Sequence, residues 1–243
     1  MHIRVINPNT TVEMTERIEV SARAAAGPGT HVDAVSPAMG PASIESHYDE
    51  ALSVPGLLTE VTRGERAGVD AYVIACFGDP GLDAARELAH GPVVGIAEAA
   101  MRAACFLGRG FSVVTTLERT KGRAWDLADR YGARPFCRGV HACDIPVLDL
   151  DKDPAVTERV VALGRDALDR DGSDVIVLGC AGMADLCATV SDRLGVPVVD
   201  GVAAGTAFAE SLVRLGLRTS AREEFAAPPA KKYTGWLADL AIT

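Results

Sequence analysis

The sequence lacks the features that would place this protein in a membrane or on nucleic acid. It has no run of about 18 or more uninterrupted apolar residues, which argues against a membrane-spanning segment. Lysine and arginine number 24 against 33 aspartates and glutamates, a net charge of −9, whereas phosphate binding needs clustered cations. We therefore expect a soluble protein with neither a membrane nor a nucleic acid as partner.

A targeting signal and a disulfide framework are also missing. The chain goes directly from Met1 into a β-branched run that ends at Ile6, without the basic region, hydrophobic stretch and cleavage site of a secretion signal. The 6 cysteines are too sparse for a disulfide scaffold. These two absences predict a cytoplasmic protein with reduced thiols.

Motifs for nucleotides, metals and organic cofactors are absent too. There is no phosphate-binding GxxxxGK[ST] loop, no GxGxxG after a predicted strand and no HExxH pair. Cys137, His141 and Cys143 lie close in the sequence, but they lack the paired spacing and the obvious fourth ligand of a zinc site. We expect no metal and no cofactor.

The composition itself, 48% hydrophobic and 23% charged over 243 residues, is typical of a compact α/β protein of one or two domains. Short apolar runs alternate with longer amphipathic segments, which predicts βαβ units and parallel sheets. The predicted strands span residues 3–6, 72–75, 93–96, 111–114, 175–178 and 196–199, and a helical pattern follows at 207–215. Thr10 with Glu13, and Thr115 with Glu118, have capping-box spacing and predict two helix starts.

An internal repeat organises the chain. Residues 68–82 align with residues 172–186 at an offset of 104, and the alignment superimposes Cys76 on Cys180. Each cysteine ends a predicted strand and is followed two residues later by glycine. Residues 92–94 align with residues 197–199 at an offset of 105. The repeat predicts two similar α/β halves of roughly 100 residues each and a further C-terminal segment.

The repeated cysteines indicate a specific chemistry. Open α/β sheets bind ligands at the carboxyl ends of their strands, so two halves facing each other about a pseudo-two-fold axis would place both thiols in one cleft. Two opposed thiols suit the removal of a proton from one face of a carbon and its return to the other face, which is racemisation or epimerisation. One thiol must then be ionised, and we expect helix N-termini and nearby donors to lower its pKa from the ordinary value of about 8.5.

A structural role is the alternative for every cysteine in the chain. A single cysteine at the end of a strand is commonly a small buried apolar residue. Cys105 and Cys187 lie in predicted helices and fit that description. Cys76 and Cys180 fit it less well, because unrelated cysteines have no reason to share a position and a following glycine in both halves. We therefore predict that these two are catalytic.

Five motifs carry a family resemblance. They are Val5-Ile6-Asn7-Pro8-Asn9-Thr10, Gly40-Pro41-Ala42-Ser43-Ile44-Glu45, Ala75-Cys76-Phe77-Gly78-Asp79-Pro80-Gly81, Leu178-Gly179-Cys180-Ala181-Gly182-Met183 and Pro197-Val198-Val199-Asp200-Gly201. In combination they resemble the hydantoin racemases, within the aspartate/glutamate racemase superfamily. The resemblance spans almost the whole chain.

The resemblance implies a fold and a set of site residues. It implies two pseudo-symmetric α/β domains, residues 1–98 completed by C-terminal helices in 205–243 and residues 99–204, each with a mainly parallel sheet flanked by helices and with the active site in the cleft between them. It further implies a cofactor-independent homo-oligomer with Cys76 and Cys180 as the acid/base pair. The implied substrate-binding residues are Asn9, Thr10, Ser43, Ile44, Phe77, Gly78, Thr116, Thr120, Ala181 and Gly182.

The residues that follow the cysteines favour a neutral cyclic amide as the substrate. In the aspartate and glutamate racemases the cysteines are followed by Asn-Thr, which hold charged groups, whereas this chain has Phe77-Gly78 and Ala181-Gly182. Apolar and backbone groups suit a hydantoin ring, whose C5 hydrogen is acidified by the neighbouring carbonyl and amide nitrogen. We predict the racemisation of 5-monosubstituted hydantoins by proton transfer between thiolate and thiol.

Other functions stay open. Within the superfamily they are allantoin racemisation, maleate isomerisation and arylmalonate decarboxylation, of which the last needs only one cysteine. A ligand-sensing relative without turnover is a different class, and a thiol redox protein, which would form a Cys76–Cys180 disulfide, is another. The substituent at C5 is open as well, with Ile44, Tyr48, Phe77 and Met183 as the expected pocket walls.

Overall fold

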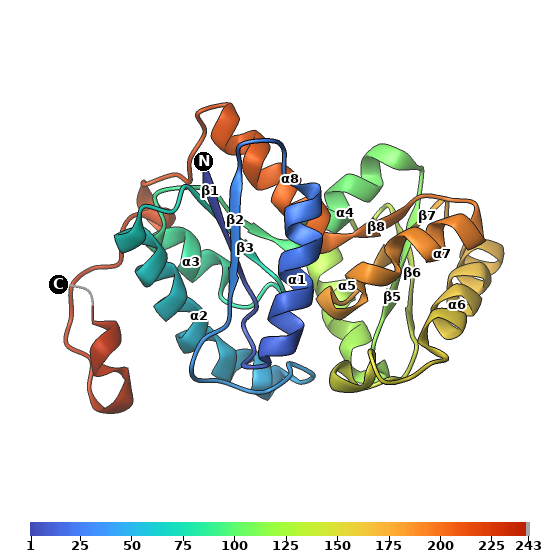
Figure 1. The fold of residues 1–243 in the computed structure, drawn as a ribbon, viewed down its shortest axis with the longest axis horizontal. Coiled ribbons are helices and arrows are strands. Elements are labelled where there is room, and N and C mark those ends of the chain that lie inside the picture. Colours follow the sequence, from blue (N-terminus) through green and yellow to red (C-terminus); the bar gives the residue numbers. More distant parts are fainter. Residues whose placement is uncertain (242–243) are drawn as a thin grey trace.

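The computed structural model describes residues 1–241 and consists of two lobes, each built on a four-stranded sheet (Figure 1). The first sheet has the order β2-β1-β3-β4 and the second has the order β6-β5-β7-β8, so the two halves share one topology. All neighbouring strands run parallel. The strands are β1 His2–Ile6, β2 His31–Val35, β3 Ala71–Ile74, β4 Val93–Gly95, β5 Phe111–Thr115, β6 Cys137–Ala142, β7 Val175–Leu178 and β8 Val198–Asp200. The predicted α/β class with parallel sheets is confirmed.

Burial explains which strands the sequence reveals. Strands β3 and β7 lie inside their sheets, and every residue of both is buried, so each is a continuous run of apolar residues. Strands β2 and β6 lie at sheet edges, where Asp33 and Arg138 interrupt the apolar pattern. For this reason the sequence did not predict these two strands, although it located the other six to within two residues.

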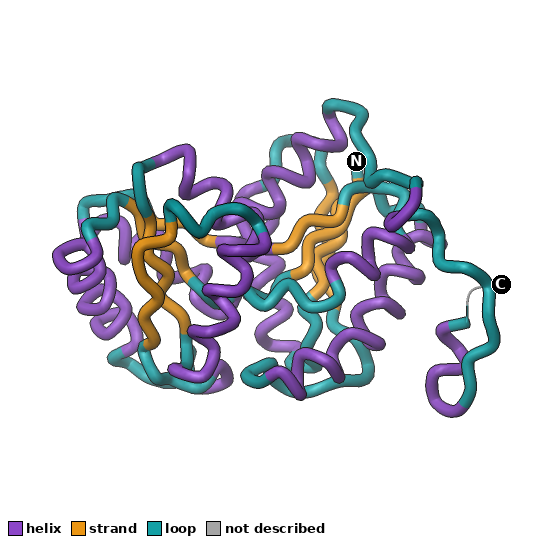
Figure 2. The backbone as a smooth tube through the Cα atoms, turned by 180° about the vertical axis from the view of Figure 1, so that it is seen from behind, coloured by secondary structure: helices purple, strands orange, loops and turns teal. Residues whose placement is uncertain are grey.

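The helices cover both faces of each sheet, as the view from behind in Figure 2 shows. They are α1 Val12–Ala25, α2 His47–Ala67, α3 Leu82–Leu88, α4 Ile96–Leu107, α5 Lys121–Arg130, α6 Val156–Asp171, α7 Cys187–Leu194 and α8 Gly201–Arg214. Short 3-10 helices are η1 Glu118–Thr120, η2 Val147–Asp149, η3 Ala181–Leu186, η4 Glu223–Phe225 and η5 Gly235–Leu240. The apolar face of each long helix packs against a sheet.

Two helices cross between the lobes. Helix α4 follows β4 of the first sheet but packs on β5, β7 and β8 of the second. Helix α8 follows β8 of the second sheet but packs on β1, β3 and β4 of the first, and on α1. The two helices also pack against each other between the lobes. The packing of α8 supports our proposal that residues 205–243 complete the first domain; beyond α8 the described chain has only η4 and η5, which contact α3 and α2.

Both predicted capping boxes are wrong. Helix α1 begins at Val12 and its N-cap is Thr11, which makes no side-chain capping bond. The Thr10 hydroxyl instead donates to the Pro41 carbonyl at 3.4 Å. Thr115 ends strand β5, and its hydroxyl donates to the Gly179 carbonyl at 3.2 Å. In both cases a backbone carbonyl of another segment accepts from the hydroxyl that was expected to cap a helix.

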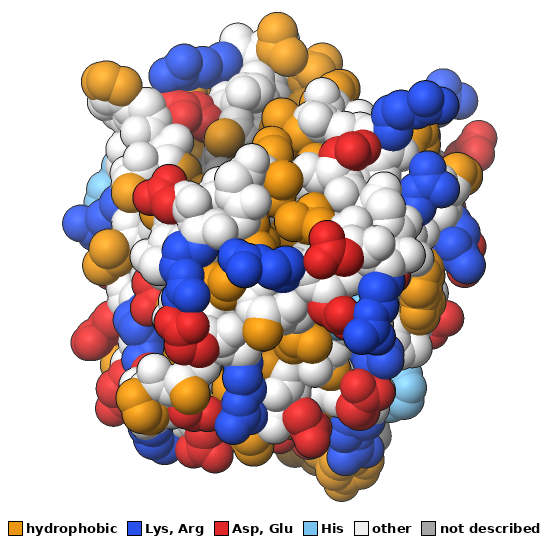
Figure 3. Space-filling view, turned by 90° about the vertical axis from the view of Figure 1, so that its right-hand side faces the viewer, with side chains coloured by type: hydrophobic (Ala, Val, Ile, Leu, Met, Phe, Trp, Pro, Cys, Tyr) orange, Lys and Arg blue, Asp and Glu red, His pale blue; other side chains and the backbone are white. Residues whose placement is uncertain are grey.

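The surface carries charges of both signs. Figure 3 shows Lys and Arg side chains interspersed with Asp and Glu over one face, without a continuous basic area. In the second lobe, an ion pair between Glu158 and Arg193 links helices α6 and α7. Among residues 1–241, no helix is both long enough and apolar enough to cross a membrane. The expected homo-oligomeric state and location stay predictions.

Candidate active site

A cavity lies between the lobes, at the carboxyl ends of the strands of both sheets. Its walls come from the loops that follow β1, β2, β3, β5 and β7, together with the starts of α1 and α2 and parts of η1, η2 and α5. Its volume of about 180 Å³ corresponds to roughly six waters at ~30 Å³ each, which suits a small molecule. The position agrees with the general rule that α/β sheets bind ligands at the ends of their strands.

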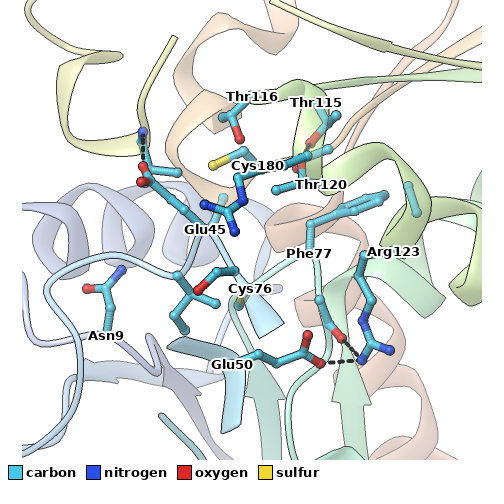
Figure 4. Close-up of a pocket in the computed structure, with 18 of the residues that line it drawn as sticks. Asn9, Glu45, Glu50, Cys76, Phe77, Thr115, Thr116, Thr120, Arg123 and Cys180 are labelled. Carbon is cyan, nitrogen blue, oxygen red and sulfur yellow. Dashed lines mark hydrogen bonds and ion pairs between the residues drawn. The ribbon is translucent and has the colours of Figure 1, made fainter. Parts of the chain in front are cut away.

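Cys76 and Cys180 both line this cavity and approach it from opposite lobes (Figure 4). Each lies two residues beyond the end of a central strand, β3 or β7. Each sulfur accepts a hydrogen bond from the backbone N–H of the glycine two residues later, Gly78 or Gly182. Both glycines adjoin their thiols closely, since a Cβ on them would lie in van der Waals contact with the sulfur, 3.8 Å from the Cys76 Sγ and 3.6 Å from the Cys180 Sγ. The repeat therefore builds the same thiol site twice.

The expectation of a lowered thiol pKa is wrong. Burial raises the pKa of Cys76 to about 12, although the Gly78 N–H partly opposes this, and the neighbouring Cys180 raises it further. Burial likewise raises the pKa of Cys180 to about 12, against the Gly182 N–H. The loss of hydration destabilises each thiolate more than its one backbone N–H donor stabilises it. Both thiols are therefore protonated at neutral pH.

The predicted substrate-binding residues divide into two groups. Seven line the cavity: Asn9, Ile44, Phe77, Gly78, Thr116, Thr120 and Ala181. Thr10, Ser43 and Gly182 lie outside its lining, and a role for them in substrate binding stays a prediction. Two of the expected pocket walls are not walls, because Tyr48 is exposed on α2 and Met183 is buried in the core of the second lobe.

Asn9 presents an amide donor to the cavity. Its side-chain oxygen accepts from the Asn7 amide and from the Thr11 N–H, both at 2.9 Å. Its Nδ2 contacts the sulfur of Met14 at 3.3 Å, a weak acceptor. Asn7 does not line the cavity, and its contribution is to fix the orientation of Asn9. The Asn9 Nδ2, whose one contact is this weak acceptor, is the polar group that Asn9 can offer to a carbonyl oxygen in the cavity.

The threonines differ in what their hydroxyls bind. The Thr120 hydroxyl donates to the Leu117 carbonyl at 2.8 Å and lies 3.2 Å from the Thr115 hydroxyl. Thr116 is 3% exposed and lines the cavity, and in the described part of the chain its hydroxyl has no hydrogen-bond partner. Thr116 therefore has the donor available for a ligand, whereas Thr120 supports the loop.

A charged bridge holds the Cys76 loop from the opposite lobe. Arg123 of α5 forms an ion pair with Glu50 of α2 and donates to the Gly78 carbonyl at 2.7 Å (Figure 4). Burial raises the pKa of Glu50, with the Arg123 charge opposing it. The sequence reasoning missed this bridge because a pair of residues so far apart in the chain leaves no local pattern. Its effect is to fix the Gly78–Asp79 peptide, which adjoins the one that carries the Gly78 N–H.

Two further charged residues line the cavity: Glu45, which lies in one of the five sequence motifs, and Arg119, which the sequence reasoning missed. The Glu45 carboxylate accepts from the Val147 N–H of η2 at 2.7 Å, so it joins the lobes across the cavity. Arg119 also lines the cavity. The cavity is therefore more polar than the sequence suggested.

The cysteine and histidine cluster considered for zinc is dispersed in the structure. The His141 ring nitrogen lies 2.6 Å from a carboxylate oxygen of Asp171. The Cys143 thiol donates to the Thr116 carbonyl at 3.6 Å, and Cys137 to the Gly139 carbonyl at 3.7 Å. Within residues 1–241, no three His, Cys, Asp or Glu side chains converge on a point that could hold a metal ion.

A matched pair of cysteines in a cleft between two repeated lobes agrees with the comparison to known families. Residues 3–209 match the model of the Asp/Glu/Hydantoin racemase family. The chain belongs to this family. The resemblance inferred from the five sequence motifs is thereby confirmed.

Relatives of this racemase are named for two different substrates, hydantoins and allantoin. The hydantoin racemase of Pseudomonas sp. (strain NS671) is 50% identical over 238 residues, which cover 98% of this chain and 96% of the relative. That of Rhizobium meliloti is 50% identical over 236 residues, covering 97% and 98%. Among solved structures, allantoin racemase from Klebsiella pneumoniae is 49% identical with a TM-score of 0.97 and covers 99% of both chains. The protein is an enzyme, an isomerase of the racemase type.

Proposed function

We propose that this racemase inverts 5-monosubstituted hydantoins at C5 by proton transfer between Cys76 and Cys180, without a cofactor. The observation that carries the proposal is the position of the two thiols, which line one cavity from opposite lobes, each with its own backbone donor. A substrate carbon between them is accessible on both faces. A one-cysteine reaction such as decarboxylation would leave the second thiol without a role.

The proposed reaction is a balanced exchange of protons. One cysteine, as thiolate, takes the C5 proton, and the electron pair of the C5–H bond moves toward the adjacent ring carbonyl. The other cysteine, as thiol, then gives its proton to the opposite face of C5 and becomes the thiolate. The Asn9 amide and the Thr116 hydroxyl are the donors placed to bind the ring carbonyls, where negative charge accumulates.

The electrostatics disfavour a second negative charge on the pair once one thiol is ionised. Burial raises the pKa of both thiols, and the proximity of Cys180 raises that of Cys76 further. Two thiolates at once are therefore strongly disfavoured, while one thiolate beside one thiol is the form that the reaction needs. The mechanism works in either direction, because the two cysteines exchange roles when the other enantiomer binds.

Allantoin, a hydantoin with a ureido group at C5, is the second candidate substrate. The observation that favours it is the polar wall of the cavity, where the carboxylates of Glu45 and Glu50 lie. Carboxylates accept hydrogen bonds from N–H groups of the kind that a ureido substituent offers. The likeness to the allantoin racemase of Klebsiella pneumoniae supports the same choice. The apolar walls formed by Ile44 and Phe77 favour aliphatic or aromatic substituents instead.

Polarimetry on single enantiomers tests both proposals. The panel consists of benzyl-, isobutyl-, methylthioethyl- and ureido-hydantoin, with chelator present throughout. We expect rotation to decay to zero, and the fastest compound identifies the substituent that the wall accepts. If no compound is racemised but one raises the unfolding temperature, the protein is a ligand sensor. If activity depends on reductant and mass spectrometry finds a Cys76–Cys180 disulfide, the redox alternative holds.

A further inference from the structure

The two crossing helices begin at equivalent positions of the repeat but are capped differently. Gly95 precedes α4 and Asp200 precedes α8, at the repeat offset of 105 residues. Both residues have the extended conformation of an N-cap, with φ −84° and ψ 142° at Gly95 and φ −87° and ψ 128° at Asp200. The Asp200 carboxylate accepts from Val202 N at 3.0 Å and Ala203 N at 2.9 Å, whereas Gly95 has no side chain with which to cap α4.

The carboxylate that caps α4 comes from the Cys76 loop. Asp79 accepts from Ala97 N at 3.0 Å and from Glu98 N at 2.9 Å, the same two helix positions that Asp200 binds in α8. Gly95 makes room for it, because a Cβ there would lie 2.3 Å from the Asp79 carboxyl carbon. Both helices are therefore capped by an aspartate carboxylate at the same two N–H positions. In α8 the carboxylate belongs to the N-cap residue itself, whereas in α4 it comes from the loop that carries Cys76.

Asp79 is buried, and both its backbone and its side chain form hydrogen bonds. It is 1% exposed and has a left-handed backbone with φ 45°, and its N–H donates to the Cys76 carbonyl at 2.9 Å. Its carboxylate also accepts from the Tyr131 hydroxyl at 2.7 Å, just beyond α5. In the second half the equivalent residue is Met183, whose N–H makes the matching bond to the Cys180 carbonyl at 3.1 Å. Its apolar side chain offers no such anchor.

We propose that Asp79 is a positioning residue for Cys76: by binding the first turn of α4 and Tyr131, it holds the turn from Cys76 to Gly78, and with it the thiol and its backbone donor, against the cavity. Cys180 has no equivalent anchor. This inference rests on the proposed function, in which each thiol acts on one face of C5. It follows that loss of Asp79 should impair the proton transfer of Cys76 more than that of Cys180.

An exchange of two residues separates this role from simple helix capping. In the double variant Asp79→Gly with Gly95→Asp, the carboxylate caps α4 from the N-cap position, as it does in α8, and glycine accepts the left-handed conformation at 79. The measurement is the initial rate of deuterium incorporation at C5 in deuterium oxide, for each enantiomer of 5-benzylhydantoin and of allantoin. Cys76→Ser and Cys180→Ser identify which enantiomer each thiol deprotonates.

We expect the double variant to unfold near the wild-type temperature and to incorporate deuterium about tenfold more slowly from the enantiomer that Cys76 deprotonates, relative to the other enantiomer. Asp79→Asn, which keeps the size and the left-handed preference, should shift the ratio in the same direction but less. Asp200→Gly is the matched control, since it removes the cap of α8 and should lower the unfolding temperature without changing the ratio.

Two results would overturn the inference and are distinguishable from failure of the proposed function. If the double variant keeps both the wild-type rates and the wild-type ratio, Asp79 only caps α4; if it slows both enantiomers equally, Asp79 supports the site as a whole and not Cys76. If the wild-type enzyme itself incorporates no deuterium from either enantiomer, the proposed racemisation is wrong, and this inference is wrong with it.

Discussion

The loops that carry Cys76 and Cys180 share a hydrogen-bond pattern but differ in backbone conformation and in support, since Asp79 is left-handed with φ 45° whereas the second loop continues into η3. In both, a thiol follows a buried strand, receives a glycine N–H and lies in a turn closed by the third residue. The Cys76 loop is held by charged groups, since Arg123 binds its Gly78 carbonyl. The Cys180 loop has no charged support: the Thr115 hydroxyl binds its Gly179 carbonyl, and Leu150 packs against Gly182. The proposed reaction requires two thiols of similar acidity, but it does not require the same groups to hold the two loops.

Replacement of either thiol by serine is the largest expected effect and would show whether the two loops act on opposite faces. We expect Cys76→Ser and Cys180→Ser each to lower the rate of racemisation by about a thousandfold, because serine is nearly isosteric but far less acidic. In deuterium oxide each variant should still exchange the C5 hydrogen of one enantiomer, and the enantiomer should differ between them. Exchange of the same enantiomer by both would contradict the two-thiol mechanism.

The next largest effect is expected from removing a hydroxyl that donates to a carbonyl of the substrate. This prediction compares two threonines of the second lobe. Thr116→Val should lower kcat by about a hundredfold, since the hydroxyl of Thr116 is available to stabilise the developing negative charge. Thr120→Val is the control, because that hydroxyl already donates to the Leu117 carbonyl. Equal losses in the two variants would mean that these hydroxyls stabilise the loop and not the substrate.

The pH dependence of the reaction tests whether the two thiols have similar pKa values although different groups hold their loops. Burial raises the pKa of both cysteines, so the thiolate fraction is small at neutral pH and grows with pH. We expect kcat/KM to rise by about tenfold per pH unit between pH 7 and 9, as follows for a base that titrates above this range. The two serine variants should show the same slope in their residual exchange. A profile that is flat over this range would contradict the raised pKa values.

The charged bridge to the Cys76 loop is expected to have the smallest effect. Arg123→Lys keeps the charge beside Glu50 but loses the planar group that reaches both Glu50 and the Gly78 carbonyl. We expect kcat to fall a few-fold. The rate of C5 exchange should fall more for the enantiomer that Cys76 deprotonates than for the other enantiomer. Arg102→Lys, at an exposed pair with Glu98 on α4, is the matched control and should leave the rates unchanged. A loss confined to KM would show that Arg123 contacts the substrate directly.

The sequence predicted those parts of the molecule that are set by local pattern or by repetition. The buried strands β3 and β7, the equivalence of Cys76 with Cys180 and the glycines after them are visible in the chain itself. The edge strands β2 and β6 were missed because their exposed positions are polar. The raised thiol pKa was missed because burial in a cavity between lobes is a property of the assembled fold.

The contacts between distant segments could not be predicted in the same way. The bridge from Arg123 to Glu50 joins two helices of different lobes, and the bond from Glu45 to Val147 joins two loops. Neither leaves a spacing that a sequence pattern would detect. A departure from the repeat was visible, since Gly95 aligns with Asp200, but its meaning depends on where the Asp79 side chain lies.

The crossing of α4 and α8 also bears on how such a chain could arise. Each helix leaves its own half and covers the sheet of the other, and the two meet between the lobes. This is the geometry expected from duplication and fusion of an ancestral half-length chain that formed a dimer by exchanging its last helix. In such an ancestor the two thiols would belong to different subunits, and a catalytic site would exist only in the pair. Fusion then allows one half to change independently of the other.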